Sequence, residues 1–145
     1  MQIKELLEYS GNNYAEYFVT DGEHDLLCMC TSVPLPHDVP PQRGMEIEMI
    51  YVFSYHELIF KKVTDRLSQK HGIYKEKNKH FKYCLTGQVL DPTRSLIRIF
   101  GFTISLEYDY REGLPADFAA DDYVEIIADR LDASIDLSCL PYDAI

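Results

Sequence analysis

Apolar and polar residues alternate over several short stretches of this chain, with the period of two that is typical of β-strands. Tyr14 to Thr20 is rich in aromatic and β-branched residues, and Leu26 to Val33 is an apolar run. Asp21-Gly22 lies between them and is typical of a tight hairpin turn. The pattern predicts a first hairpin, followed after a loop with proline and glycine by a strand over 45–55.

A second group of strands is predicted farther along the chain. Tyr83 to Leu90 is predicted to be a strand. It leads into a predicted turn at Asp91-Pro92-Thr93, where proline favours the backbone angle of a turn. Ser95 to Glu107 then reads as one long strand, and Tyr123 to Leu131 as another.

The two groups line up at a spacing of 70 residues, which aligns Asp21 with Asp91. We therefore interpret 14–56 and 83–132 as two three-strand meanders that form a pseudo-repeat, linked by 57–82. Similar β-patterning without any duplication gives the same match, so both explanations stay open.

The linking segment is predicted to hold a short helix. Phe60, Val63 and Leu67 recur at helical spacing, and Gly72 is placed to end the helix. A second helix is indicated at the N-terminus by Ile3, Leu6 and Leu7.

The predicted strands resemble those of OB-fold barrels. A glycine-bearing strand, Thr86-Gly87-Gln88-Val89, precedes a long strand, a loop and a third strand that ends in Arg130-Leu131-Asp132, and Gly44 opens the third strand of the first group in a similar way. The resemblance implies a small antiparallel barrel with a helix after the third strand. It includes no specific motif, and a sixth strand departs from the five-stranded OB pattern.

Length and composition predict one soluble folded domain, 1–145. The chain has 145 residues, 46% hydrophobic and 26% charged, and this size suffices for a single core. No apolar run reaches the roughly 18 residues of a membrane span, and the N-terminal residues lack the features of a signal peptide. Four cysteines, without the density of a secreted disulfide scaffold, favour the reducing cytoplasm.

Charge is distributed unevenly along this acidic chain. The net charge is −10, yet the stretch from Lys61 to Lys82 holds eight of the fourteen basic residues and is locally +6, between two flanks of −8 each. Aromatic residues are interleaved with these bases, the mixture that single-stranded nucleic acid binding uses. The candidate anion-binding residues are Lys61, Lys62, Arg66, Lys70, Tyr74, Lys75, Lys77, Lys79, Phe81 and Lys82. A solvated helix and loop is the alternative explanation of the same run.

Other clusters of residues that could bind a metal ion are explained more simply by a structural role. Cys28-Met29-Cys30 with His24 suggests metal ligands, but a core strand explains it better. The alternating acids Asp21, Glu23 and Asp25 lack the rest of a calcium loop. The acidic group near the last strand favours a solubilising face over a magnesium site, and consists of Asp117, Asp121, Asp122 and Glu125.

Arg98, Phe100 and Phe102 are expected on the inward face of the long strand, with the head of Arg98 at the rim. The chain has no nucleophile elbow, phosphate loop or zinc-protease motif. We therefore expect no cofactor, no metal and no disulfide, and we favour a protein that is not an enzyme.

Three hypotheses of function follow. The first is a non-catalytic acidic interaction module whose partner is a protein, for which the acidic flanks favour a basic one. The second is an OB-like binder of single-stranded nucleic acid or another polyanion through 61–82, which requires the bases to gather on one surface. An enzyme with an unrecognised site is the third.

Overall fold

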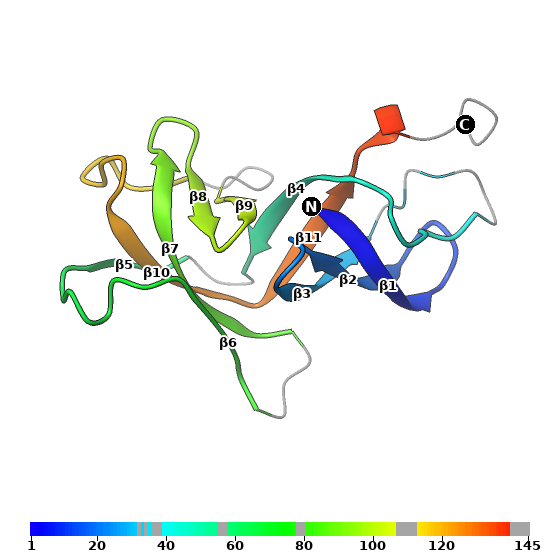
Figure 1. Ribbon diagram of the computed structural model, residues 1–145, viewed down its shortest axis with the longest axis horizontal. Helices are drawn as coiled ribbons and strands as arrows, with labels where there is room; N and C mark the ends of the chain where they lie inside the picture. Colours follow the sequence, from blue (N-terminus) through cyan, green and yellow to red (C-terminus); the bar gives the residue numbers. More distant parts are fainter. Residues whose placement is uncertain are drawn as a thin grey trace. The chain divides into compact units, whose positions relative to one another are not determined.

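The computed structural model describes residues 1–31, 33, 35, 39–54, 58–77, 81–106 and 113–139, and these are mainly β (Figure 1). A short 3-10 helix, Leu137–Cys139, follows the last strand. The strands are β1 (Gln2–Tyr9), β2 (Ala15–Thr20), β3 (Asp25–Cys30), β4 (Ile47–Phe53), β5 (Phe60–Val63), β6 (Gly72–Lys75), β7 (Tyr83–Asp91), β8 (Leu96–Ile99), β9 (Phe102–Ser105), β10 (Tyr123–Ala128) and β11 (Arg130–Ile135).

The strands of the described residues join into one sheet that is not closed into a barrel. Their hydrogen-bonded order is β1-β2-β3-β11-β4-β9-β8-β7-β10-β5, and β6 pairs with β7 beside this path. The sheet thus has two ends, β1 and β5, where the resemblance to OB-folds implied a closed barrel. No helix in the described part of the chain is long and apolar enough to cross a membrane.

The chain divides into two compact units with different charge. The first comprises Met1–Ile50 and Asp132–Ile145, and the second comprises Tyr51–Leu131. The first unit holds 2 basic and 12 acidic residues, whereas the second holds 12 of each. The whole net charge of −10 therefore belongs to the first unit, and the basic segment is balanced by acids of its own unit.

The first unit is built on the predicted hairpin. β2 and β3 pair antiparallel from Ala15–Cys30 to Thr20–Asp25, with Asp21-Gly22 at the turn, where Gly22 has a φ of 104°. β3 also pairs with β11 in parallel, at Met29 and Asp132. Residues Leu26 to Met29 are all buried, because neighbouring structure covers both faces of this strand. The prediction of a core strand at Cys28-Met29-Cys30 is confirmed for Cys28 and Met29.

The second unit is organised around β7. This strand pairs with β10 along residues 83–88, with β6 on its other side at residues 83–86, and with β8 at residues 88–91. Leu85, Val124 and Ile126 are fully buried, so alternate positions of β7 and β10 face the core. The predicted turn at Asp91-Pro92 is confirmed: Asp91 Oδ1 accepts the backbone N–H groups of Thr93 and Arg94.

The helix predicted in the linking segment is not formed. Phe60 and Val63 belong to β5, which pairs with β10, and a turn at residues 66–68 follows. Asp65 directs this turn: its side chain accepts the N–H of Leu67 at 3.0 Å, and its carbonyl accepts the N–H of Ser68 at 3.0 Å. Such local hydrogen bonds compete with helix formation, while β10 supplies the strand with partners.

The N-terminal helix is likewise replaced by a strand, β1. Register shifts between Ile3 and Glu5 and between Leu6 and Glu8 interrupt its pairing with β2. Because each β-bulge adds one residue to the strand, inward-facing Ile3 and Leu6 come to stand three positions apart. The helical spacing in the sequence results from these bulges.

The long strand predicted over 95–107 is in fact a hairpin, β8 and β9, that turns at Phe100-Gly101. Ile97 and Ile99 face the core before the turn, and Phe102 and Ile104 face it afterwards. Arg98 is therefore on the exposed side and not on the inward face, which corrects the expectation for this residue.

Similar turns do not give the two groups of strands the same neighbours. In the second group, the last strand, β10, pairs with the first strand of the same group, β7. In the first group, the last strand, β4, is separated from β3 by β11 and pairs with β9 on its other side. The pseudo-repeat and the single folding domain remain predictions.

Candidate functional site

The basic segment is distributed over two edges of the second unit. Lys61 and Lys62 lie on β5, and Tyr74 and Lys75 lie on β6. The order β5-β10-β7-β6 puts three strand spacings, about 14 Å, between these edges. Arg66 and Lys70 are exposed in the link between the two strands.

Lys62 is bound within its own unit. Its Nζ donates to the carbonyl oxygen of Asp117 at 2.8 Å, lies 3.2 Å from Asp122 Oδ2, and stands over the Phe118 ring at 5.2 Å. The pKa of Asp122 is lowered, first by the N–H of Ala119, which its carboxylate accepts, and then by Lys62. This part of the basic segment thus anchors the acidic loop that precedes β10.

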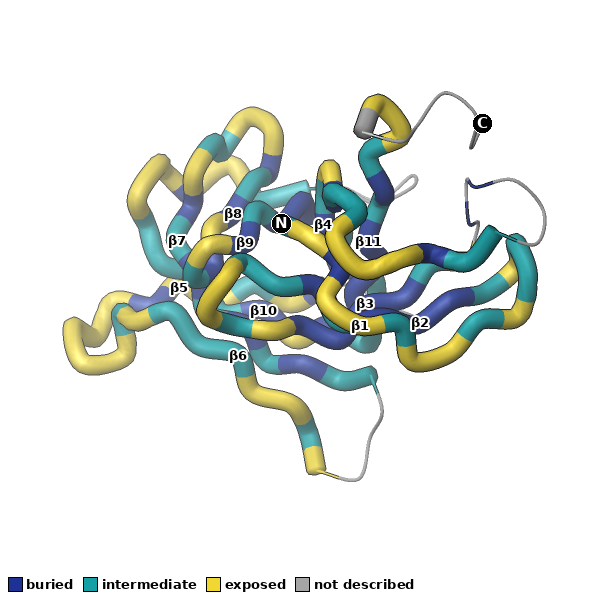
Figure 2. Tube along the Cα trace, turned by 45° about the vertical axis from the view of Figure 1, so that its right-hand side comes forward, coloured by how far each residue is buried: buried dark blue, intermediate teal, exposed yellow. Residues whose placement is uncertain are grey.

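The other half of the basic segment belongs to a hairpin formed by β6 and the start of β7. Figure 2 shows that much of the β6 strand of this hairpin is exposed. Tyr74 retains 64% of its accessible surface, and Lys75 and Lys77 are exposed. Lys82 pairs with Glu76 at 3.7 Å. Phe81 is half-buried, and Lys79 lies outside the described residues.

An apolar row crosses the solvent face of this sheet. Ile127 pairs with Cys84, and Cys84 pairs with Tyr74, so the three side chains point to the same side of neighbouring strands. Ile127 is 49% exposed. Burial, and after it the charge of Glu125, raises the pKa of the Cys84 thiol, which favours its neutral form.

Polar residues continue this face toward the other end of the strands. Lys61, Glu125 and Thr86 occupy the next outward row, and beyond it Arg98 Nη2 donates to Gln88 Oε1 at 3.2 Å. Tyr123 is covered by His71 of the link that leads into β6, with ring centroids 5.8 Å apart. The uncovered end of the face is therefore the apolar row.

Sequence reasoning singled out Tyr74 but missed its neighbours Ile127 and Cys84. A signal for Ile127 was present: in Tyr123–Ala128 the buried residues are Val124, Ile126 and Ala128. Ile127 alternates with these buried residues, so the sequence places an apolar side chain on the solvent face of the strand. No local sequence pattern indicates that Ile127 and Cys84 lie in one row with Tyr74, because the row depends on the pairing of three strands.

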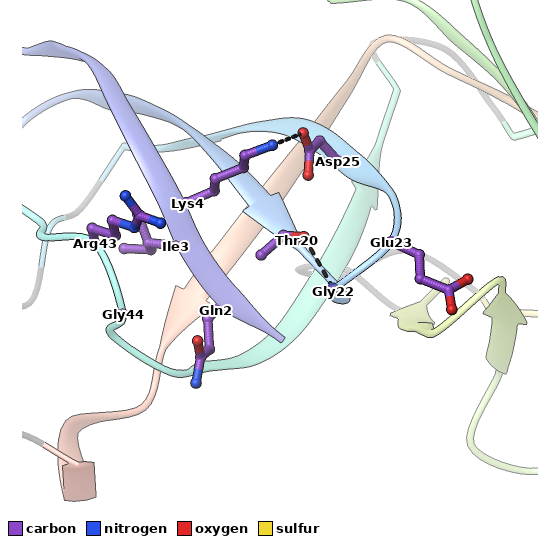
Figure 3. Close-up of a pocket in the computed structure, with 9 residues that line it drawn as sticks. All are labelled: Gln2, Ile3, Lys4, Thr20, Gly22, Glu23, Asp25, Arg43 and Gly44. Atoms are coloured by element: carbon purple, nitrogen blue, oxygen red, sulfur yellow. Dashed lines mark hydrogen bonds and ion pairs between the residues drawn. The ribbon is translucent and has the colours of Figure 1, made fainter.

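The first unit has an open hollow of about 300 Å³ beside β1 and the β2–β3 turn (Figure 3). Lys4 points to Asp25 across it and pairs with that carboxylate at 2.6 Å, which lowers the pKa of Asp25. Thr20 Oγ1 accepts the N–H of Gly22 at 3.0 Å. Arg43 also lines the hollow, while Glu23 points away from the ion pair (Figure 3). These groups stabilise the turn, and the residues that line the hollow include no serine, cysteine or histidine.

The clusters considered as metal sites have structural roles. Cys28 is fully buried, and the pKa of its thiol is raised by that burial. Asp21 Oδ1 accepts the N–H groups of Glu23 and His24 at 2.9 and 2.6 Å, which makes it a turn cap. Across the described ranges, no group of three or more His, Cys, Asp or Glu side chains is arranged to hold a metal ion.

Comparison of the chain with protein-family models, with curated proteins and with solved structures finds no significant match.

Proposed function

We propose that this protein is a non-catalytic interaction module that binds a protein partner through the solvent face of β10, β7 and β6. The observation that supports it is the row Ile127, Cys84 and Tyr74, in which two large side chains, Ile127 and Tyr74, remain exposed on either side of Cys84. Exposed aromatic and apolar residues next to polar ones are typical of protein interfaces, and Lys61, Glu125 and Thr86 border the row on one side. The −10 charge of the first unit supports a partner that also carries a basic surface.

A photo-crosslinking phenylalanine analogue in place of Tyr74 tests the proposal in the cells that make the protein. The matched control carries the same analogue at Leu67, which is 81% exposed but lies on the link rather than in the row. We expect a defined protein to be captured from position 74 and not from position 67. Capture from both positions alike contradicts the proposal.

Binding of the purified captured protein then provides the quantitative test. Tyr74→Ser and Ile127→Ser should each weaken it about tenfold, the loss typical of residues that contribute strongly to an interface. Leu67→Ser removes an even more exposed apolar side chain elsewhere in the unit and should change the affinity less than about twofold. Equal affinities for all four proteins exclude this face.

A second candidate is binding of single-stranded nucleic acid or another polyanion, which the exposed ring of Tyr74 next to Lys75 and Lys77 favours. Neutralising Lys75, Lys77, Lys79 and Lys82 together should then flatten the salt dependence of oligonucleotide binding by roughly 0.7 log-log units per lost phosphate contact. Fluorescence anisotropy at several salt concentrations measures this. Absence of binding at low salt eliminates the candidate.

We further propose that the protein works in the reducing cytoplasm. Cys28, Cys30 and Cys84 are thiols rather than disulfides, and reduced cysteines suit that compartment.

A further inference from the structure

The outer edge of β6 is open. β6 pairs with β7 on one side, from Gly72–Thr86 to Lys75–Tyr83. On its other side, no backbone group of the described residues is hydrogen-bonded to it. Figures 1 and 2 both show β6 at the margin of its sheet. An open strand edge offers a row of donors and acceptors to an incoming strand.

The backbone N–H and C=O groups of successive β6 residues point alternately toward β7 and away from it. Glu76 donates its N–H to the carbonyl of Lys82 at 2.9 Å and so faces β7. Because hydrogen-bonded pairs alternate along antiparallel strands, Tyr74 also directs its N–H and C=O toward β7. Ile73 and Lys75 consequently direct theirs away from β7, to the open side.

The other two sheet edges are protected against strand addition. β1 has two bulges, and the N–H and C=O of its Ile3 are already bonded to Met45 and Gly44. The two central residues of β5 are both lysines, Lys61 and Lys62. Bulges and edge lysines are the devices by which sheets avoid pairing with other chains. β6 is paired without a register shift, and its two central residues are Ile73 and Tyr74.

The basic residues near β6 determine which charge a bound segment should carry. Lys70, Lys75 and Lys77 are exposed around the strand, and Lys82 is balanced by Glu76. Charges within about one Debye length, roughly 8 to 10 Å, dominate the choice of a bound peptide at physiological salt. A second copy of β6 would bring these lysines toward their own counterparts, whereas an acidic segment complements them.

We propose that β6 accepts an extended acidic segment of the partner protein as an added strand, through the outward backbone groups of Ile73 and Lys75. Backbone bonds then supply affinity, and Tyr74 on the adjoining face supplies contact with the side chains of the segment. This inference rests on the proposed function, because it specifies how that same partner binds.

A fluorescein-labelled peptide of nine alternating Glu and Val residues serves as the probe. The control peptide has the same charge, with proline in place of valine, so that it cannot pair as a strand. Lys75→Pro removes the outward N–H while leaving the bonds to β7 intact, and Lys75→Ala removes the same charge but keeps the N–H. The unfolding midpoint of each variant establishes that it is folded.

We expect the Glu-Val peptide to bind at least about fivefold more tightly than the proline peptide, and Lys75→Pro to bind it about fivefold more weakly than Lys75→Ala, as the loss of one hydrogen bond implies. In the wild-type protein, the peptide should slow hydrogen exchange at the Ile73 and Lys75 amides. Equal binding by the two variants, equal binding of the two peptides, or unchanged exchange at both amides overturns the inference.

The outcomes separate this inference from the proposed function. If Lys75→Pro behaves like Lys75→Ala while Tyr74→Ser still weakens the captured partner, strand addition is wrong and the interaction face stands. If Tyr74→Ser also has no effect on that partner, the proposed function fails as well. Binding of oligothymidylate without binding of the peptide overturns the inference in favour of a polyanion site.

Discussion

The Nδ1 atom of His71 lies 2.7 Å from the backbone nitrogen of Phe100 and accepts its N–H. Phe100 has a φ of 51°, a left-handed conformation that is uncommon for a bulky residue. The two rings also pack edge to face, with centroids 6.0 Å apart. This contact holds the β8–β9 turn against the link that leads into β6.

Protonation of His71 should weaken the fold. Burial, and after it the charge of Arg98, lowers the pKa of His71 below its ordinary value of 6.5, so the unfolded chain binds this proton more readily than the native protein. Stability is therefore expected to fall as the pH drops below about 6.5. Urea unfolding at several pH values measures this.

His71→Ala serves as the reference for that pH effect. It should cost about 1 kcal/mol at neutral pH and should reduce the loss of stability below pH 6.5, because the variant lacks the titrating acceptor. An identical pH dependence in wild type and variant shows that His71 is not responsible.

Gly87→Ala should destabilise the second unit. A Cβ at this position would lie 2.6 Å from Ile99 Cγ1 and 2.7 Å from the carbonyl oxygen of Arg98, and backbone atoms cannot yield as a flexible side chain does. We expect a loss of about 1 to 3 kcal/mol. Gly72→Ala is the matched control, since its Cβ would meet nothing within 4 Å. Similar unfolding midpoints for the two variants contradict the close approach of β7 and β8.

Tyr17→Phe should destabilise the first unit by about 1 kcal/mol. The Tyr17 hydroxyl donates to the carbonyl of Ala133 at 3.0 Å in a fully buried position, so the substitution removes a buried hydrogen bond. Tyr74→Phe removes a hydroxyl at an exposed position and should have no measurable effect. Chemical denaturation compares the two, and an unchanged midpoint for Tyr17→Phe argues against this bond.

The cysteines should differ in reactivity toward a thiol reagent. Cys28 should not react in the native protein because it is fully buried and its thiol pKa is raised, whereas Cys84, partly exposed, should react slowly. In the denatured, unreduced protein all four thiols should titrate. A count of two thiols, or one zinc per chain by elemental analysis, contradicts the expectation of neither disulfide nor metal.

Local sequence patterns determined the β class and the main turns of this protein. Asp21-Gly22 and Asp91-Pro92 are turns in the structure because their conformations depend on neighbouring residues only. The alternation in Tyr123–Ala128 likewise suffices to predict β10. Such signals act within a few residues, which is the range that a sequence pattern can report.

Tertiary pairing decided the rest. Phe60 and Val63 have helical spacing, yet β10, some sixty residues away in sequence, supplies hydrogen bonds that make them a strand. The row that joins Tyr74 to Cys84 and Ile127, and the open edge at Ile73 and Lys75, exist only once β6, β7 and β10 are aligned. No local pattern encodes these features, because a strand's partners and its free edge are set by hydrogen bonds between segments that are distant in sequence.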